Sequence, residues 1–268
     1  MTQRPPLERP RVTRWFVFLA LLRRDARVAR RELRYFLVRT LMQPILFLIV
    51  FGYLLPEMGF MRPDYTTALL PGILAVAMAL SALQSVALPM VADFGYTKEI
   101  EDRLLAPIPI SLLALEKVAA GAVQGVFAAA VILPVAHWIM GEVAGLSLSD
   151  VGTALFVTAA GATMFAALGL LLGTLIQPQQ MGLLFSIIVA PMLMFGCAYY
   201  PWRGLAKVPG FQYGVLVNPL VYVSEAMRAA ITPEVPHMPL WASCSAMAAL
   251  ALLFTIAGIR CFERRAIG

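Results

Sequence analysis

Long apolar stretches alternate with short polar segments along most of this chain. A helix needs about 20 mainly apolar residues to cross a bilayer, because the hydrocarbon core is about 30 Å thick and each residue rises about 1.5 Å. Six stretches come close to this length, so the pattern predicts an all-α integral membrane protein with six transmembrane helices. The predicted spans are residues 35–55, 69–92, 118–140, 151–176, 181–199 and 240–259.

Apolar and basic residues are arranged differently in the segment 14–34, which precedes the first span. Its larger apolar side chains can share one helical face, while the arginines mostly lie elsewhere. This is typical of an amphipathic helix in the membrane interface, so residues 1–34 are expected to form a cytoplasmic arm with an interface helix. A solvated tail is the alternative. The candidate interface-helix residues are Trp15, Phe16, Leu19, Leu22, Val28, Arg23, Arg24, Arg27, Arg30 and Arg31.

A charged segment, "YTKEIEDRLL", separates the second and third predicted spans. It favours helix, with Glu99 and Arg103 spaced for an i,i+4 pair, and Pro107 and Pro109 would end that helix. A short helix with a charged and an apolar side suits docking to a soluble partner, whereas a solvated connector is the plainer interpretation. The predicted docking segment is 97–113, and its candidate contact residues are Lys98, Glu99, Glu101, Asp102, Arg103, Leu104, Leu105 and Pro107.

The segment 200–236, between the fifth and sixth spans, is too polar and proline-rich to cross the membrane, yet too apolar for a free loop. Two short helices, interrupted at Pro209 and at Pro219, would fit if they enter from the outer face. Non-helical backbone is tolerated at that depth only where protein or a watery cavity covers it. Glu225 and Arg228, three residues apart, are expected to stabilise this re-entrant segment rather than to bind cargo.

Composition agrees with a membrane domain. Of the 268 residues, 60% are hydrophobic and 13% are charged, whereas soluble domains carry about 25% charged residues. We therefore expect one transmembrane domain, residues 35–259, followed by a short cytoplasmic tail, residues 260–268.

The basic residues predict the orientation of the spans. With a cytoplasmic N-terminus, seventeen Lys and Arg residues lie inside and four outside, because eleven of them precede residue 40. The positive-inside rule therefore places both termini and the segment 97–113 in the cytoplasm. The net charge of +6 belongs to the arm beside the membrane lipids, so no nucleic-acid partner is expected.

The sequence contains no recognisable catalytic or nucleotide-binding motif. None of the three lysines follows a GxxxxG loop, and no HExxH, GxSxG or Cys/His cluster occurs. We therefore predict neither an enzyme nor a chain that binds a metal or cofactor itself.

Ionisable groups are almost missing from the spans, which makes a proton or cation pathway improbable and calls for a separate energy source. The candidate pathway-lining residues are Ser81, Gln84, Ser85 and Gln124. A secondary transporter or channel, and a non-transporting membrane scaffold, are the alternatives to a transporter driven from outside the chain.

Two pairs of glycines show the small-xxx-small spacing of closely packed membrane helices. They are Gly121 with Gly125 and Gly169 with Gly173. The spacing fits packing within the chain and packing between two copies equally well.

Three motifs in this order resemble the membrane subunits of type-2 ABC exporters, a family that includes drug-resistance, nodulation-factor and polysaccharide or glycolipid exporters. "EDRLLAPIP" follows the second span, and residues 165–201 are similar to the family's hairpin of the fourth and fifth spans. "NPLVYVSEAMRAAI" precedes the last span. Its matching residues are Asn218, Pro219, Leu220, Tyr222, Glu225 and Arg228.

The resemblance implies a mechanism and a set of partners. The segment 97–113 would be a coupling helix seated in a soluble P-loop subunit, with two such subunits holding ATP and Mg²⁺. A second copy or a paralogue would complete the translocation path in a bacterial inner membrane. The apolar spans suit an amphipathic, lipid-linked or drug-like cargo. Export is the direction that the family implies.

Overall fold

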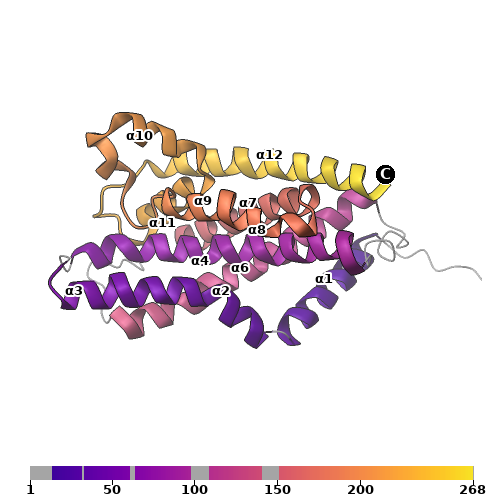
Figure 1. Cartoon of the computed structure of the whole chain (residues 1–268), viewed down its shortest axis with the longest axis horizontal. Coiled ribbons are helices and arrows are strands. Elements are labelled where there is room, and N and C mark those ends of the chain that lie inside the picture. Colours follow the sequence, from indigo (N-terminus) through magenta and orange to yellow (C-terminus); the bar gives the residue numbers. More distant parts are fainter. Residues whose placement is uncertain (1–13, 32, 61–63, 98–108, 141–150, 268) are drawn as a thin grey trace, which may run out of the picture.

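In the computed structural model, residues 14–31, 33–60, 64–97, 109–140 and 151–267 are described. They form helices and the turns between them, with no strand in these ranges. Long helices packed side by side make up the molecule (Figure 1). The four longest are α4 (Asp64–Ala92), α6 (Ile110–Met140), α7 (Val151–Leu175) and α12 (Leu240–Ile267).

Four helices among the described residues are long and apolar enough to cross a membrane, and they correspond to the second, third, fourth and sixth predicted spans. The chain is therefore an integral membrane protein. Two shorter apolar helices, Leu41–Glu57 and Pro178–Met194, occupy the places of the first and fifth predicted spans.

Each of these shorter helices includes a turn of π-helix. The first consists of α2 (Leu33–Phe47), the π-turn η1 (Leu48–Leu54) and α3 (Leu55–Glu57) in direct succession. The other comprises the 3₁₀ turn η3 (Pro178–Gln180), α8 (Met181–Leu183), the π-turn η4 (Leu184–Val189) and α9 (Ala190–Met194).

The sequence predicted that the fifth span ends at residue 199, but the helix ends earlier, at Met194. Bends follow it, and Cys197 adopts a left-handed φ of 51°, which a continuing helix does not allow.

The helix α4 lies at the centre of the bundle and is buried over most of its length. It packs against α6, α7 and α11 (Pro219–Ile231). The glycine pairs of α6 and α7 face it: a Cβ on Gly125 would lie 2.8 Å from Ala82 Cβ, and one on Gly169 would lie 2.6 Å from the Leu83 carbonyl oxygen. The small-xxx-small spacings therefore serve close packing within the chain.

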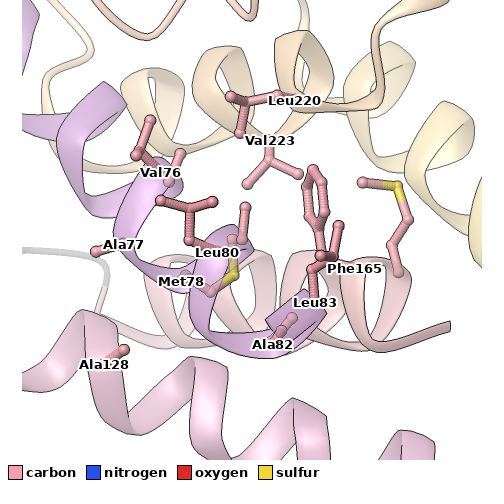
Figure 2. Packing of buried hydrophobic residues seen from close by; sticks show 14 of the residues in the cluster. Val76, Ala77, Met78, Leu80, Ala82, Leu83, Ala128, Phe165, Leu220 and Val223 are labelled. Atoms are coloured by element: carbon pink, nitrogen blue, oxygen red, sulfur yellow. The ribbon is translucent and has the colours of Figure 1, made fainter. Parts of the chain in front are cut away.

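The hydrophobic core continues from α4 toward the short helix α11. In Figure 2 the ring of Phe165, from α7, lies beside Leu83 of α4 and Val223 of α11. All three side chains are fully buried. Because α11 is buried on nearly every face, it belongs to the core of the bundle rather than to a surface loop.

Three helices extend further than the sequence predicted, and α4 begins at Asp64, five residues before its predicted span. The helix α6 begins at Ile110, eight residues before the predicted span, because the helix-favouring sequence directly after Pro109 already supports the first turn. The helix α12 continues to Ile267, so most of the predicted tail is helical. Its C-terminal end and α1 (Arg14–Arg31) lie toward one end of the bundle, whereas α3 and α10 (Pro209–Gly214) lie at the other (Figure 1).

Candidate functional site

The segment before α12 folds into short helices, as the sequence predicted, and its prolines begin helices rather than interrupt them. After the 3₁₀ turn η5 (Trp202–Lys207), α10 starts at Pro209 and α11 starts at Pro219, with the turn η6 (Val215–Val217) between them. Proline suits the first helical position because its fixed φ is helical and its missing N–H would have no intrahelical partner.

Asn218 joins the start of α11 to the end of α9. Its Oδ1 accepts a hydrogen bond from the Leu220 N–H at 3.0 Å, which caps the helix. Its Nδ2 donates to the Met192 carbonyl oxygen at 2.7 Å. Further along, the Tyr222 hydroxyl donates to the Leu216 carbonyl oxygen at 2.8 Å, so the entry into α11 is fixed on two sides.

Glu225 and Arg228 form an ion pair inside the protein. Both side chains have 0% exposure, and Arg228 Nη1 lies 2.5 Å from Glu225 Oε1. Two charges withdrawn from water are tolerated only if geometry and further hydrogen bonds compensate their lost hydration. Burial lowers the pKa of Arg228, and the nearby Glu225 carboxylate opposes this shift.

The remaining donors of Arg228 bind backbone carbonyls from two other segments. Its Nη2 donates to the carbonyl oxygen of Ala68, on α4, at 3.2 Å and to that of Cys197 at 3.1 Å. Cys197 also has the left-handed φ of 51°, so Arg228 binds the carbonyl of a residue in an otherwise unfavourable conformation.

Both carboxylate oxygens of Glu225 also accept backbone N–H groups. Oε1 accepts from Trp202 at 2.9 Å, and Oε2 accepts from Met238, just before α12, at 2.7 Å. The pair therefore connects α4, the end of the fifth apolar helix, η5, α11 and the entry to α12. A stabilising role for Glu225 and Arg228 stays a prediction, and these contacts are of the kind that such a role requires.

An apolar crevice of about 540 Å³ lies between α7, the fifth apolar helix, the external helices and α12. Its size is within the range of small-molecule pockets. Asn218 is its most polar lining residue, and both ends of that side-chain amide are already engaged. The lining comprises Leu168, Ile187, Ile188, Pro191, Met192, Phe195, Gly210, Phe211, Gly214, Val215, Val217, Asn218, Pro219 and Phe254.

The four candidate pathway-lining residues lie elsewhere, on α4 and α6. Ser81 is fully buried and donates to the Gln124 carbonyl oxygen at 3.0 Å. Ser85 donates within its own helix to Ala82, and Gln84 is largely buried. In the single chain these side chains are close to the packing contact of the two helices, and none of them lines the crevice.

The arginine-rich helix α1 rests against α6 through a contact that the sequence analysis missed. Lys117 forms an ion pair with Asp25 of α1, and Glu116 lies 3.5 Å from the same ammonium nitrogen. Asp25 is the only acidic residue in α1, which is the one sequence signal that sets it apart. The five candidate arginines of this helix are all exposed (Arg23, Arg24, Arg27, Arg30 and Arg31).

Part of the apolar face predicted for α1 also points away from the bundle, although Leu22 is half-buried. Trp15 is 68% exposed, and Leu19 and Val28 are each about half exposed. An apolar face without protein cover on a helix beside membrane-spanning helices is what an interface helix presents to lipid.

The predicted docking residues, from Lys98 to Pro107, lie outside the described residues. The chain enters this segment from the π-turn η2 (Asp93–Thr97) and leaves it at Pro109, before α6. The last residues of the predicted segment, 110–113, form the first turn of α6.

Long apolar helices packed around the buried helix α11 are the architecture of an integral membrane protein. A family model described as "ABC-2 type transporter" matches residues 17–232. The chain belongs to this family, which confirms the resemblance, and is a transmembrane permease subunit of an ABC transporter.

Curated relatives of the chain are described as transport permeases of the inner membrane. The chain is 26% identical, over 201 residues, to the "Inner membrane transport permease YadH" of Escherichia coli strain K12. The match covers 71% of this chain and 75% of the relative. Proteins of the same name from Escherichia coli O157:H7 and Shigella flexneri match to the same extent.

Proposed function

We propose that this chain is the membrane-spanning half of an ATP-driven exporter in a bacterial inner membrane, with six spans and both termini in the cytoplasm. The observation that carries the proposal is the separation of features between the two ends of the bundle. The arginine-rich helix α1 and the C-terminal end of α12 lie toward one end, and the external helix α10 lies at the other (Figure 1).

The six-span topology is supported by the lengths of the two shorter apolar helices. The run from α2 to α3 covers Leu33–Glu57, and the other covers Pro178–Met194. Spans range from about 17 to 25 residues, so both fall within the usual limits. Six crossings also return the chain to the side where it began, in agreement with the positions of the basic residues.

The charged segment from Lys98 to Leu105 is proposed to dock into a soluble ATP-binding subunit, with the arginines of α1 beside it. Permeases of this family generally pair with such a subunit. The contact between Asp25 and Lys117 places α1 against α6, the helix that follows the charged segment in the chain. ATP and Mg²⁺ would be bound by the partner, since permeases of this family are generally not catalytic.

A complete transporter would contain two permease chains and two ATP-binding subunits, with the translocation path between the permeases. The polar residues Ser81, Gln84, Ser85 and Gln124 stay the candidate lining of that path. An amphipathic, lipid-linked or drug-like cargo is supported by the apolar crevice, whose lining leaves no polar side-chain group for a hydrophilic ligand. Because the crevice lies between α7 and α12, we propose that a cargo already dissolved in the membrane can enter it.

The decisive experiment changes the charges of the proposed docking segment. The triple variant E101K/D102K/R103E should lose its ATP-binding subunit during mild purification, or keep it without stimulated ATP hydrolysis. Its spans should fold normally, because the three changes fall between the second and third predicted spans. Reversing two exposed charges of the external segment, R203E/K207E, provides the matched control and should leave assembly and ATP hydrolysis unchanged.

Full assembly and wild-type transport by the triple variant would show that the coupling assignment is wrong. The alternatives predict different results for the wild-type chain. A secondary transporter would purify alone and move cargo without nucleotide, and a scaffold would recruit an ATPase without stimulating it.

A further inference from the structure

Segments far apart in the sequence meet around Arg265, near the end of α12. Its Nη1 donates to the carbonyl oxygen of Thr174 at 2.6 Å and to that of Ile176 at 3.2 Å. These carbonyls belong to the end of α7, where helix geometry leaves the last carbonyl groups without intrahelical partners. A cation at this position also interacts favourably with the helix dipole.

The same guanidinium lies over an aromatic ring from a third segment. Its central carbon is 4.6 Å from the ring centroid of Phe94, in the π-turn η2. Phe94 in turn meets Phe262 edge to face, with the ring centroids 5.6 Å apart. One side chain of α12 therefore contacts α7 by hydrogen bonds and η2 by a cation–π interaction.

The backbone of η2 also touches the turn that follows α7. A Cβ on Gly95 would lie 2.1 Å from the Cγ atom of Pro178, so glycine is needed for this approach. Three residues after Gly95, the charged segment starts at Lys98. The base of the charged segment is thus in direct contact with the ends of α7 and α12.

We propose that Arg265 is a positioning residue for energy coupling. It joins η2 to α7 and α12, so that displacement of the charged segment is passed to these two helices. The inference rests on the proposed docking of an ATP-binding subunit to that segment. Transmission requires that the contact be kept while both sides move, and a guanidinium that bonds two carbonyls and one ring can keep it through small shifts.

The test follows movement of α12 at its far end, where Cys244 carries a half-buried thiol. Cys197 is fully buried, so replacing Cys261 by serine leaves Cys244 as the reactive thiol. The permease is purified with its ATP-binding subunit, and the rate of Cys244 modification by N-ethylmaleimide is measured with and without ATP plus vanadate.

In the otherwise wild-type complex, nucleotide should change the modification rate severalfold. Arg265→Ala should abolish this change while the amount of bound ATP-binding subunit and the unfolding temperature stay near wild type. Arg264→Ala is the matched control, because Arg264 is the adjacent, exposed arginine of the same helix, and it should respond fully. Arg265→Lys keeps a cation that can bind a carbonyl and should restore part of the response.

A second pair of variants tests the same junction without removing a charge. Gly95→Ala places a methyl group against the ring of Pro178 and should reduce the nucleotide response severalfold. Adding Pro178→Ala removes the obstructing ring atoms and should restore most of it. If the double variant is as impaired as Gly95→Ala alone, this contact does not position η2.

The proposal is overturned if Arg265→Ala responds to nucleotide as the wild type does. It is also overturned if the unfolding temperature of that variant falls and its ATP-binding subunit is lost at the same time, because Arg265 would then be a structural cap of α7. Failure of the proposed function gives a different result: the wild-type chain itself would purify without an ATP-binding subunit.

Discussion

The two ends of the helix bundle are held together by different kinds of contact. At the end with the external helices, Glu225 and Arg228 have 0% exposure, and several backbone groups complete their hydrogen bonding. At the end with α1, Lys117 is buried, but its partner Asp25 is 19% exposed and Arg265 is half-buried, and each contact involves fewer partners. The first end is fixed by one shared buried network, and the second by separate contacts.

This difference has a consequence for movement. Removing any member of a buried charged network leaves an unpaired charge in a poorly hydrated site, so the network stays intact or fails as a whole. Partly exposed contacts cost less to break, because water replaces the lost partner. If the proposed ATP-binding subunit docks at the end with α1, we expect movement mainly at that end, while the end with α10 and α11 moves as one unit.

The largest expected effect comes from breaking the buried pair. Arg228→Met leaves the Glu225 carboxylate without its counter-charge and frees the carbonyls of Ala68 and Cys197. Loss of one partner of a buried ion pair costs about 3–5 kcal/mol, so the free energy of unfolding should fall by roughly that amount. Thermal unfolding in detergent measures it, with exposed Arg203→Met of the same segment as the control. Equal unfolding temperatures for the two variants would refute the role of the network.

A smaller effect is expected from the close approach of α4 to the segment after α9. In Gly72→Ala the new Cβ would lie 1.7 Å from the Ala198 carbonyl oxygen, a backbone atom that cannot rotate away. Overpacking of this kind typically costs about 1–3 kcal/mol.

The matched control is Gly182→Ala in α8, where a Cβ would have no neighbour within 4 Å. Alanine is favoured over glycine inside a helix, so this variant should unfold at the same or a higher temperature than the wild type. If both alanine variants lower the unfolding temperature equally, the external end is less tightly packed than its contacts indicate.

The smallest change in global stability is expected at the contact of α1 with α6. Asp25→Asn removes one partner of Lys117, but Asp25 is itself 19% exposed, and Glu116 remains 3.5 Å from the ammonium nitrogen, so the buried Lys117 keeps a counter-charge. The free energy of unfolding should fall by at most about 1 kcal/mol.

Release of α1 from α6 should nevertheless be detectable by limited proteolysis. Trypsin should cleave after the arginines of α1 severalfold faster in Asp25→Asn than in the wild type. Exposed Glu234→Gln, at the other end of the bundle, should leave the cleavage rate unchanged. A rate that is unaffected by Asp25→Asn would show that lipid contacts alone hold this helix.

Several elements followed from the sequence because their causes are local. Apolar runs predicted four of the long helices to within a few residues at most ends, since a membrane-spanning helix satisfies its backbone internally. The sequence also indicated short helices in the segment 200–236, although its prolines at 209 and 219 begin helices rather than interrupt them. The spacing of apolar residues and arginines identified α1 as amphipathic, and its ends were misplaced only slightly.

Other features depend on partners that carry no sequence signal. The carbonyls bound by Arg228 belong to Ala68 and Cys197, and a carbonyl is available at every residue, so no side chain marks them. The ends of α6 and α12 were misplaced because hydropathy follows the membrane boundary, whereas a helix continues as long as its backbone hydrogen bonds do.

The sequence by itself determined the membrane class, the number of apolar stretches and the family, because hydropathy, charge distribution and short motifs depend only on residue types. The tertiary structure alone decided which groups meet. The glycines of α6 and α7 face α4, Lys117 pairs with Asp25, and Arg265 lies between α7 and η2. Those contacts join residues far apart in the chain. Their positions follow from how the helices pack, a global property that no local pattern encodes.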